Sequence, residues 1–267
     1  MFWYQILFLA LIQGLTEFLP VSSSAHLILP AQVLNWPDQG LAFDVAVHVG
    51  TLIAVVTYFY KDIVQVVGAW FSALAGKPAT DQSRLGWYII IGTIPAGLAG
   101  LIFNDFIEEN LRSMEVIAYA TIGFGILLWL SDKLGNDKKD EYQLTWRTSL
   151  SIGVAQALAL IPGTSRSGIT MTAARAMGFS RESSARFSFL LSIPLITLAG
   201  GYKLLQLITS DVSVEWGAIL SGVVLSALSA YLCIYFFLKW LNNIGFAPFL
   251  IYRLILGGVL LVLVYAG

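Results

Sequence analysis

The sequence predicts an all-α polytopic membrane protein with six spanning helices and two re-entrant helical hairpins, arranged as two inverted-topology repeats. Of its 267 residues, 57% are hydrophobic and only 12% are charged. Mean hydropathy is +0.78, which is typical of chains that face lipid. Apolar runs close to the ~20 residues that a bilayer core requires lie near 43–60, 86–103, 116–131, 187–205, 217–238 and 249–266.

The rest of the composition excludes other classes of protein. The single cysteine, Cys233, excludes an internal disulfide and a cysteine-based metal site. A net charge of −1 without any Lys/Arg run gives no indication of nucleic-acid binding. The first apolar run lacks a basic n-region and ends at Glu17, so we expect it in the mature protein rather than in a signal peptide. We expect one integral membrane domain over residues 1–267.

Two pairs of short apolar segments, each interrupted by a polar stretch, complete the pattern. Pro20 and Pro162-Gly163 are expected to end the first helix of each pair. The pairs are 2–18 with 25–34 and 148–161 with 169–178, and both contain a Gln, a Pro and two serines in the same order (Gln13/Gln156, Pro20/Pro162, Ser22/Ser165, Ser24/Ser167). This order predicts repeats of about 1–131 and about 148–267, although any two membrane hairpins can share Gly, Pro and Ser.

Basic residues in the connections predict the orientation. Four of them lie in 132–147 and three in 61–85, whereas 104–115 contains only Arg112 against four acidic residues. Because basic connections stay in the cytoplasm, we place 61–85 and 132–147 inside and both termini outside. The first hairpin then enters from outside and the second from inside. The same count places further basic residues inside: Arg175, Arg181, Arg186, Lys239 and Arg253.

The two polar stretches are expected to meet inside the membrane. Broken helices of inverted repeats place their interrupted ends near the bilayer midplane, where an ionisable group costs roughly 2.5–3.5 kcal/mol and is a functional candidate by default. Residues 22–24 and 165–168 each lead into a helix, whose N-terminal N–H groups and dipole suit an anion. Arg166 adds a planar, permanently charged fork for phosphate oxygens.

Glu17 is the carboxylate of this predicted site. Gln13 lies four residues earlier and therefore on the same helical face. Glu17 could act as a general base or hold a hard cation, since Mg²⁺ takes one or two carboxylates and completes its shell with water and phosphate. Together these groups predict phosphoryl chemistry. Alternatives remain open: a static Glu17–Arg166 salt bridge, serines that act only as helix caps, and a His26 that only hydrogen-bonds within the bundle.

Three motifs resemble those of the bacterial undecaprenyl-pyrophosphate phosphatase family (BacA/UppP type), which is linked to bacitracin resistance. They are Gln13-x-x-x-Glu17, the run Gly14–Ser23 followed by His26, and Pro162-Gly-x-Ser-Arg-Ser-x-x-Thr170. Length and span pattern also resemble the family over the whole chain. The resemblance implies dephosphorylation of the C55 lipid carrier diphosphate to the monophosphate, which recycles the carrier for peptidoglycan synthesis. It also implies a bacterial plasma membrane location with the active site open to the periplasmic side.

The resemblance further implies the site residues. The expected catalytic set is Glu17, Ser23, His26 and Arg166, and the phosphate-binding set is Ser22, Ser165, Ser167 and Thr170 together with Arg166. A divalent cation, Mg²⁺ or Ca²⁺, is expected at Glu17 and Gln13. Many family members have Glu at the position of Gln13, and Gln can add neither a base nor a charge. The sequence leaves the oligomeric state open, a homodimer included.

Two other functions compete with the phosphatase. A polyprenyl-phosphate transporter or flippase is the second hypothesis, because inverted repeats with broken helices are a transporter architecture. An intramembrane serine hydrolase acting on peptides or esters is the third, but it gives no role to Arg166 or to a second helix terminus suited to an anion.

Overall fold

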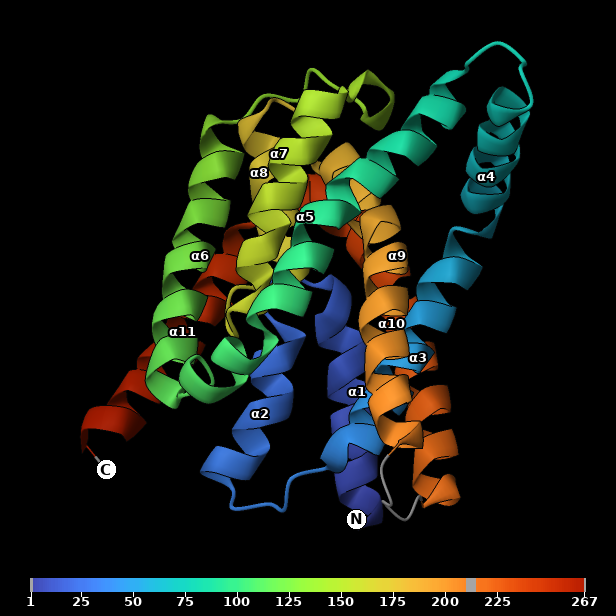
Figure 1. The fold of residues 1–267 in the computed structure, drawn as a ribbon. Helices are drawn as coiled ribbons and strands as arrows, with labels where there is room; N and C mark the ends of the chain where they lie inside the picture. The colour runs from blue at the N-terminus through green and yellow to red at the C-terminus, as the bar shows by residue number, and fades with distance from the viewer. Residues whose placement is uncertain (1, 210–214, 267) are drawn as a thin grey trace.

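The computed structural model describes residues 2–209 and 215–266, and these form a helical bundle (Figure 1). Over the described residues there are eleven α-helices and two short 3₁₀ turns, and no strand beyond one isolated bridge between Lys139 and Phe179. Helix α1 begins and α11 ends on the lower side of the bundle in Figure 1. An all-helical membrane protein is therefore confirmed.

The six predicted spans are present as six long apolar helices among the described residues. Each overlaps its predicted range, and α5 and α10 extend several residues beyond it because the helices continue into polar flanks that hydropathy does not detect. The helices are α3 (Gly40–Tyr58), α5 (Asp81–Asn110), α6 (Met114–Leu134), α9 (Arg181–Ile208), α10 (Trp216–Ile244) and α11 (Ala247–Ala266).

Four shorter helices form two helical hairpins at the predicted breaks. Helices α1 (Trp3–Phe18) and α2 (Ser23–Val33) form the first, while α7 (Trp146–Ala157), with a 3₁₀ turn at Leu158–Leu160, and α8 (Arg166–Ala176) form the second. The interrupted ends of both hairpins meet in the middle of the bundle (Figure 1). We refer to these ends, residues 19–22 and 161–165, as the hairpin tips.

Helix α1 is held in place by close packing on α10. A Cβ at Gly14 would lie 1.9 Å from Ser229 Oγ, and a Cβ at Gly50 of α3 would lie 2.0 Å from Ser226 Oγ. Such approach through small residues is a common way for membrane helices to associate. It fixes the position of the last turn of α1, which carries Glu17.

One helix was not predicted. Helix α4 (Tyr60–Leu74) lies in the connection 61–85 and packs on α5, where the rings of Trp70 and Trp87 are 5.3 Å apart. Helix α4 is too short and too polar to span a membrane, but it is amphipathic. Its Phe71 side chain is exposed. A search for long apolar runs overlooks such a helix, because its apolar side chains occupy only one face.

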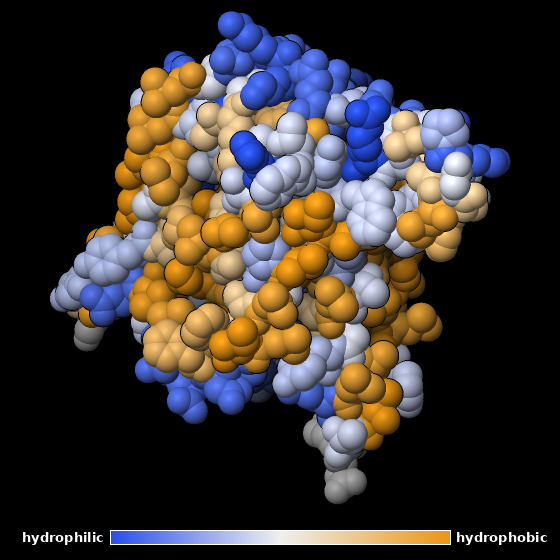
Figure 2. Space-filling view, turned by 45° about the horizontal axis from the view of Figure 1, so that its top comes forward, coloured by the Kyte–Doolittle hydropathy of each residue, from blue (hydrophilic) through white to orange (hydrophobic). Residues whose placement is uncertain are grey.

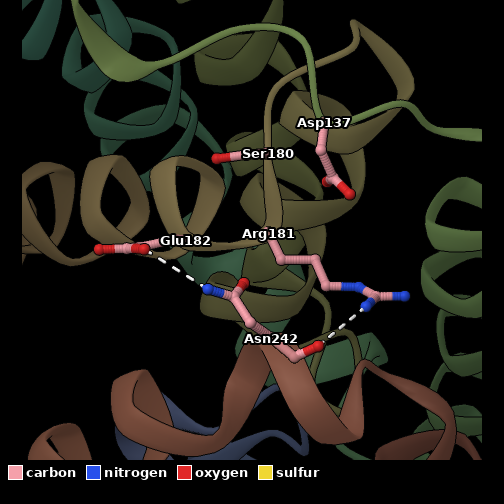
Figure 3. A pocket seen from close by; sticks show the side chains of 5 residues that line it. All are labelled: Asp137, Ser180, Arg181, Glu182 and Asn242. Atoms are coloured by element: carbon pink, nitrogen blue, oxygen red, sulfur yellow. Dashed lines mark hydrogen bonds between the residues drawn. The ribbon is translucent and has the colours of Figure 1, made fainter.

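A charged network joins α6, α8, α9 and α10 at the end that carries the connection 132–147. The buried Asp132 pairs with Arg175 (3.1 Å) and Arg181 (2.8 Å). Figure 3 shows Arg181 donating to the Asn242 carbonyl and Asn242 donating to Glu182, around a pocket of about 290 Å³. The network stabilises the end of the bundle that lies away from the hairpin tips.

The surface agrees with a membrane location. In Figure 2 hydrophobic side chains cover the middle of the molecule, and hydrophilic ones gather toward its two ends. Beneath this surface, Phe18, Phe59 and Phe189 are fully buried in the largest core cluster, which lies next to the hairpin tips. Phe18 and Phe189 pack edge to face at 5.2 Å.

Candidate active site

Glu17 connects both hairpins through its carboxylate. The side chain is buried in the last turn of α1. Its Oε1 accepts from Arg166 Nη2 at 3.1 Å, and its Oε2 accepts from Ser23 Oγ at 2.6 Å. A carboxylate, a hydroxyl and a guanidinium from α1, α2 and α8 therefore lie in direct contact.

Gln13 lies beside this carboxylate, as its four-residue spacing predicts. Its Nε2 donates to Glu17 Oε2 at 3.0 Å. Its own Oε1 is buried and has no hydrogen-bond partner among the described residues. A buried oxygen without a partner costs about 1–3 kcal/mol, so this atom is available to a cation or to a donor on a ligand.

The N-terminus of α2 carries the first serine cluster and His26. Ser22 Oγ accepts from the Gly163 N–H at 3.1 Å, which joins the two hairpin tips. Ser22 itself has φ of +75°, a left-handed conformation that costs a non-glycine residue roughly 1–2 kcal/mol. This turn directs Ser23 toward Glu17.

His26 lies one turn into α2, with both ring nitrogens occupied. Its Nδ1 is 2.7 Å from the Ser22 carbonyl, and since a carbonyl only accepts, Nδ1 carries the hydrogen. In the neutral ring, Nε2 then accepts from the hydroxyl of Tyr252 at 2.5 Å. The ring of Tyr252 lies nearly parallel to the imidazole, at 5.7 Å. His26 is therefore positioned by Tyr252 rather than by Glu17 or Ser23.

The N-terminus of α8 carries the second serine cluster. Ser165 caps the helix by accepting from the Gly168 N–H at 3.1 Å. Ser167 Oγ donates to the Leu19 carbonyl at 2.9 Å, so that it joins the two tips. Thr170 lies one turn further, with its hydroxyl 2.7 Å from the Ser188 hydroxyl and within hydrogen-bond distance of backbone carbonyls of its own helix. Ser165 thus has the cap role, while Ser167 connects the hairpins.

Arg166 bridges three helices. Besides Glu17 of α1, it donates through Nη1 to the Ser188 carbonyl of α9 at 3.0 Å. Its guanidinium lies 5.9 Å from the centre of the Phe18 ring. The side chain is 11% exposed. A fixed guanidinium beside two helix N-termini creates a positive region suited to phosphate oxygens.

Arg253 corrects one element of the topology prediction. It does not lie in a cytoplasmic connection but is fully buried in α11, where it donates to the carbonyls of Pro20 (3.1 Å), Gly163 (2.8 Å) and Thr121 (2.8 Å). The prediction was wrong because counting basic residues near helix ends ignores the direction of the side chain. A lone charge within an apolar span was the available signal. Arg253 secures both tips.

Residues 6–259 match the family described as "Bacitracin resistance protein BacA". The chain belongs to this family. It is 61% identical to "Undecaprenyl-diphosphatase 2" of Stutzerimonas stutzeri and 59% identical to "Undecaprenyl-diphosphatase 1" of Pseudoalteromonas translucida, in both cases over 97% of each chain. It is 58% identical to "Undecaprenyl-diphosphatase" of Aliivibrio salmonicida over 98% of each chain. The family resemblance of the motifs is confirmed.

Within this BacA-family chain, the predicted site residues form one region with two parts. Gln13, Glu17, Ser23 and Arg166 lie in a continuous set of hydrogen bonds. Ser22, Ser165 and Ser167 lie at the junction of the tips, with His26 and Thr170 one turn into their helices. Sequence reasoning missed Ser188 and Tyr252. Neither has a distinctive sequence signal, because each is an isolated polar residue in an apolar helix.

Proposed function

We propose that the chain hydrolyses undecaprenyl diphosphate to undecaprenyl monophosphate and inorganic phosphate, which regenerates the lipid carrier for cell-wall synthesis. The observation that supports this most is the direct contact of Glu17 with Ser23 and Arg166. A base, a hydroxyl nucleophile and a phosphate-binding fork are thereby collected between two helix N-termini. The names of the BacA-family relatives agree with this chemistry.

The mechanism begins at Ser23. Its Oγ already donates to Glu17 Oε2, so Glu17 can take the proton while Oγ forms a bond to the terminal phosphorus. The bond from that phosphorus to the bridging oxygen breaks, and undecaprenyl monophosphate leaves. The positive end of α2 lowers the energy of the developing alkoxide, and Arg166 stabilises the transferring phosphoryl oxygens.

His26 completes the proton transfers. Once protonated on Nε2, it can exchange Tyr252 for the departing monophosphate and give that oxygen its proton, while the Ser22 carbonyl still holds Nδ1. In the second half, neutral His26 accepts a proton from the water as it attacks the phosphoserine, and Glu17 returns to Ser23 Oγ the proton it took as phosphate leaves. Ser23 is then restored as a hydroxyl.

A divalent cation, Mg²⁺ or Ca²⁺, fits the donor set at Glu17 and Gln13. The unpaired Gln13 Oε1 and the carboxylate supply hard oxygen ligands. No cluster of three His, Cys, Asp or Glu side chains occurs in the described part of the chain, so the diphosphate and water would supply the remaining ligands. The cation would neutralise charge on the phosphate oxygens.

Removal of the metal tests this ligand set. Exhaustive chelation should reduce phosphate release to background because a single carboxylate binds a cation weakly without the diphosphate. Restoring Mg²⁺ or Ca²⁺ should recover the activity, which is measured as inorganic phosphate released in detergent. Full activity after chelation would leave Glu17 with the role of a base alone.

We extend the proposal to inverted repeats with re-entrant hairpins. Gln13/Gln156, Ser22/Ser165 and Ser24/Ser167 are all separated by 143 residues. Ser22 and Ser165 share a left-handed conformation, with φ of 75° and 72°, and both glutamines bury an unpaired Oε1. Helix α10 packs on α1 and α3 of the first repeat, while α5 packs on α7 and α9 of the second. Such reciprocal packing is expected of two related halves.

The orientation in the plasma membrane follows from the basic connections, with the site open to the periplasm. A cysteine placed at Asn136 in a Cys233→Ser background should react with a membrane-impermeant maleimide only after the cytoplasmic side is opened. Asn110, in the opposite connection, is the matched position and should react in intact cells. Labelling of position 136 from the periplasm would reverse the proposed orientation.

Phosphate release by purified protein separates the phosphatase from the transporter hypothesis. Wild-type protein in detergent should release phosphate from undecaprenyl diphosphate. Glu17→Gln should lose at least ~100-fold of this activity, because it removes the base that accepts the Ser23 proton. A protein that only moved the lipid would release none in either form.

A further inference from the structure

A small apolar groove lies between α3 and α9. It is lined by Val45, Val49 and Leu52 from α3 and by Ile196, Gly200 and Leu204 from α9, with a volume of about 110 Å³. A dry apolar cavity of about 150 Å³ accommodates a benzene ring. The groove therefore has the size of a single branched five-carbon unit.

Two adjacent glycines keep the groove open. A Cβ added at Gly200 or Gly201 would meet no atom within 4 Å, so neither glycine is required by close helix packing. Glycine inside a helix costs roughly 0.5–1 kcal/mol relative to alanine.

The inner end of the groove lies on the same helix as part of the active site, because α9 also carries Ser188, whose carbonyl accepts from Arg166. His48 lines the groove, with Nδ1 bonded to the Asp44 carbonyl. Leu52 packs against the core cluster that contains Phe18, the neighbour of Glu17. At the other end, Val49 and Leu204 are exposed on the lipid-facing surface. The groove thus runs from the lipid-facing surface toward the core cluster that contains Phe18.

We infer that this groove holds the isoprene unit nearest to the diphosphate of the polyprenyl substrate. The inference rests on the proposed function, and it assigns the tail a path between α3 and α9. A polyprenyl diphosphate joins an apolar chain directly to its charged group, and it needs an apolar path continuous with the phosphate site.

Filling the groove tests the inference. Gly200→Leu should raise KM for undecaprenyl diphosphate at least ~10-fold, the scale of losing one apolar group from a pocket. It should leave kcat within about twofold, because the tail binds equally in the ground and transition states. Leucine favours the helix, so the variant should fold. Gly258→Leu is the matched control, since Gly258 also has open space around its Cβ but lies on α11. An unchanged KM for Gly200→Leu would overturn the inference.

A binding measurement distinguishes failure of the groove inference from failure of the proposed phosphatase function. Undecaprenyl monophosphate with a diazirine on its first isoprene unit should cross-link to α3 or α9 of the full chain, and Gly200→Leu should reduce this labelling. Labelling confined to other helices would exclude the groove, even with an active phosphatase. Absence of phosphate release by wild type would instead contradict the proposed function.

Discussion

Ser23→Ala should abolish turnover of undecaprenyl diphosphate. We expect a loss of roughly 10⁴-fold or more, the scale on which removal of a nucleophilic serine acts in serine hydrolases. The physical reason is the 2.6 Å contact between Ser23 Oγ and Glu17 Oε2, which makes this hydroxyl the one in direct contact with the base. The measurement is phosphate release under single-turnover conditions, with folding checked by thermal unfolding in detergent.

Variants at two neighbouring residues test whether the loss of turnover is specific to Ser23. Ser24→Ala removes a hydroxyl whose one hydrogen-bond partner in the described part of the chain is Ser22 Oγ, at 3.2 Å, and it should retain most activity. His26→Ala should leave measurable turnover, because it removes a proton donor but not the attacking group. If His26→Ala were inactive while Ser23→Ala remained active, the nucleophile would be His26.

The sequence predicted the spans because a bilayer requires a long apolar run, which is visible without knowledge of packing. It also predicted the breaks between the paired short helices, since Pro20 and Pro162-Gly163 must interrupt a helix. Helix α4 was missed because an amphipathic helix at one end of the bundle needs no long apolar run. The precise extent of α5 was missed for a related reason, since its ends are polar residues that extend beyond the apolar segment.

The sequence also predicted some of the site residues, but not all of them. Glu17 and Arg166 are 149 residues apart, yet they meet because both are ionisable groups beside helix breaks within apolar segments. Arg253, Ser188 and Tyr252 could not be placed, because their roles depend on which side of a helix faces the tips. That rotation is decided by packing, for example the close approach of Gly14 to Ser229.

The contact between Glu17 and Arg166 leaves a choice between a structural ion pair and a catalytic one. A buried ion pair is weak evidence for stability, since desolvation of both charges can exceed their attraction. If the pair were only structural, replacing both residues by leucine should give a protein that folds normally, and Arg166→Lys should keep most activity. The Ser188 contact argues for positioning instead, because it fixes the second arm of the guanidinium.

Arg166→Lys should reduce kcat and kcat/KM together by at least ~100-fold, or roughly 2.7 kcal/mol, as removal of one preorganised oxyanion donor does. Lysine keeps the charge but loses the planar fork, so its single nitrogen cannot contact Glu17 and Ser188 and also bind phosphoryl oxygens. The melting temperature should change little. Arg84→Lys, at an exposed ion pair with Asp81, is the matched control and should behave like wild type. A near-wild-type Arg166→Lys enzyme would assign Arg166 to structure, and the phosphate-binding role would pass to the helix N-termini alone.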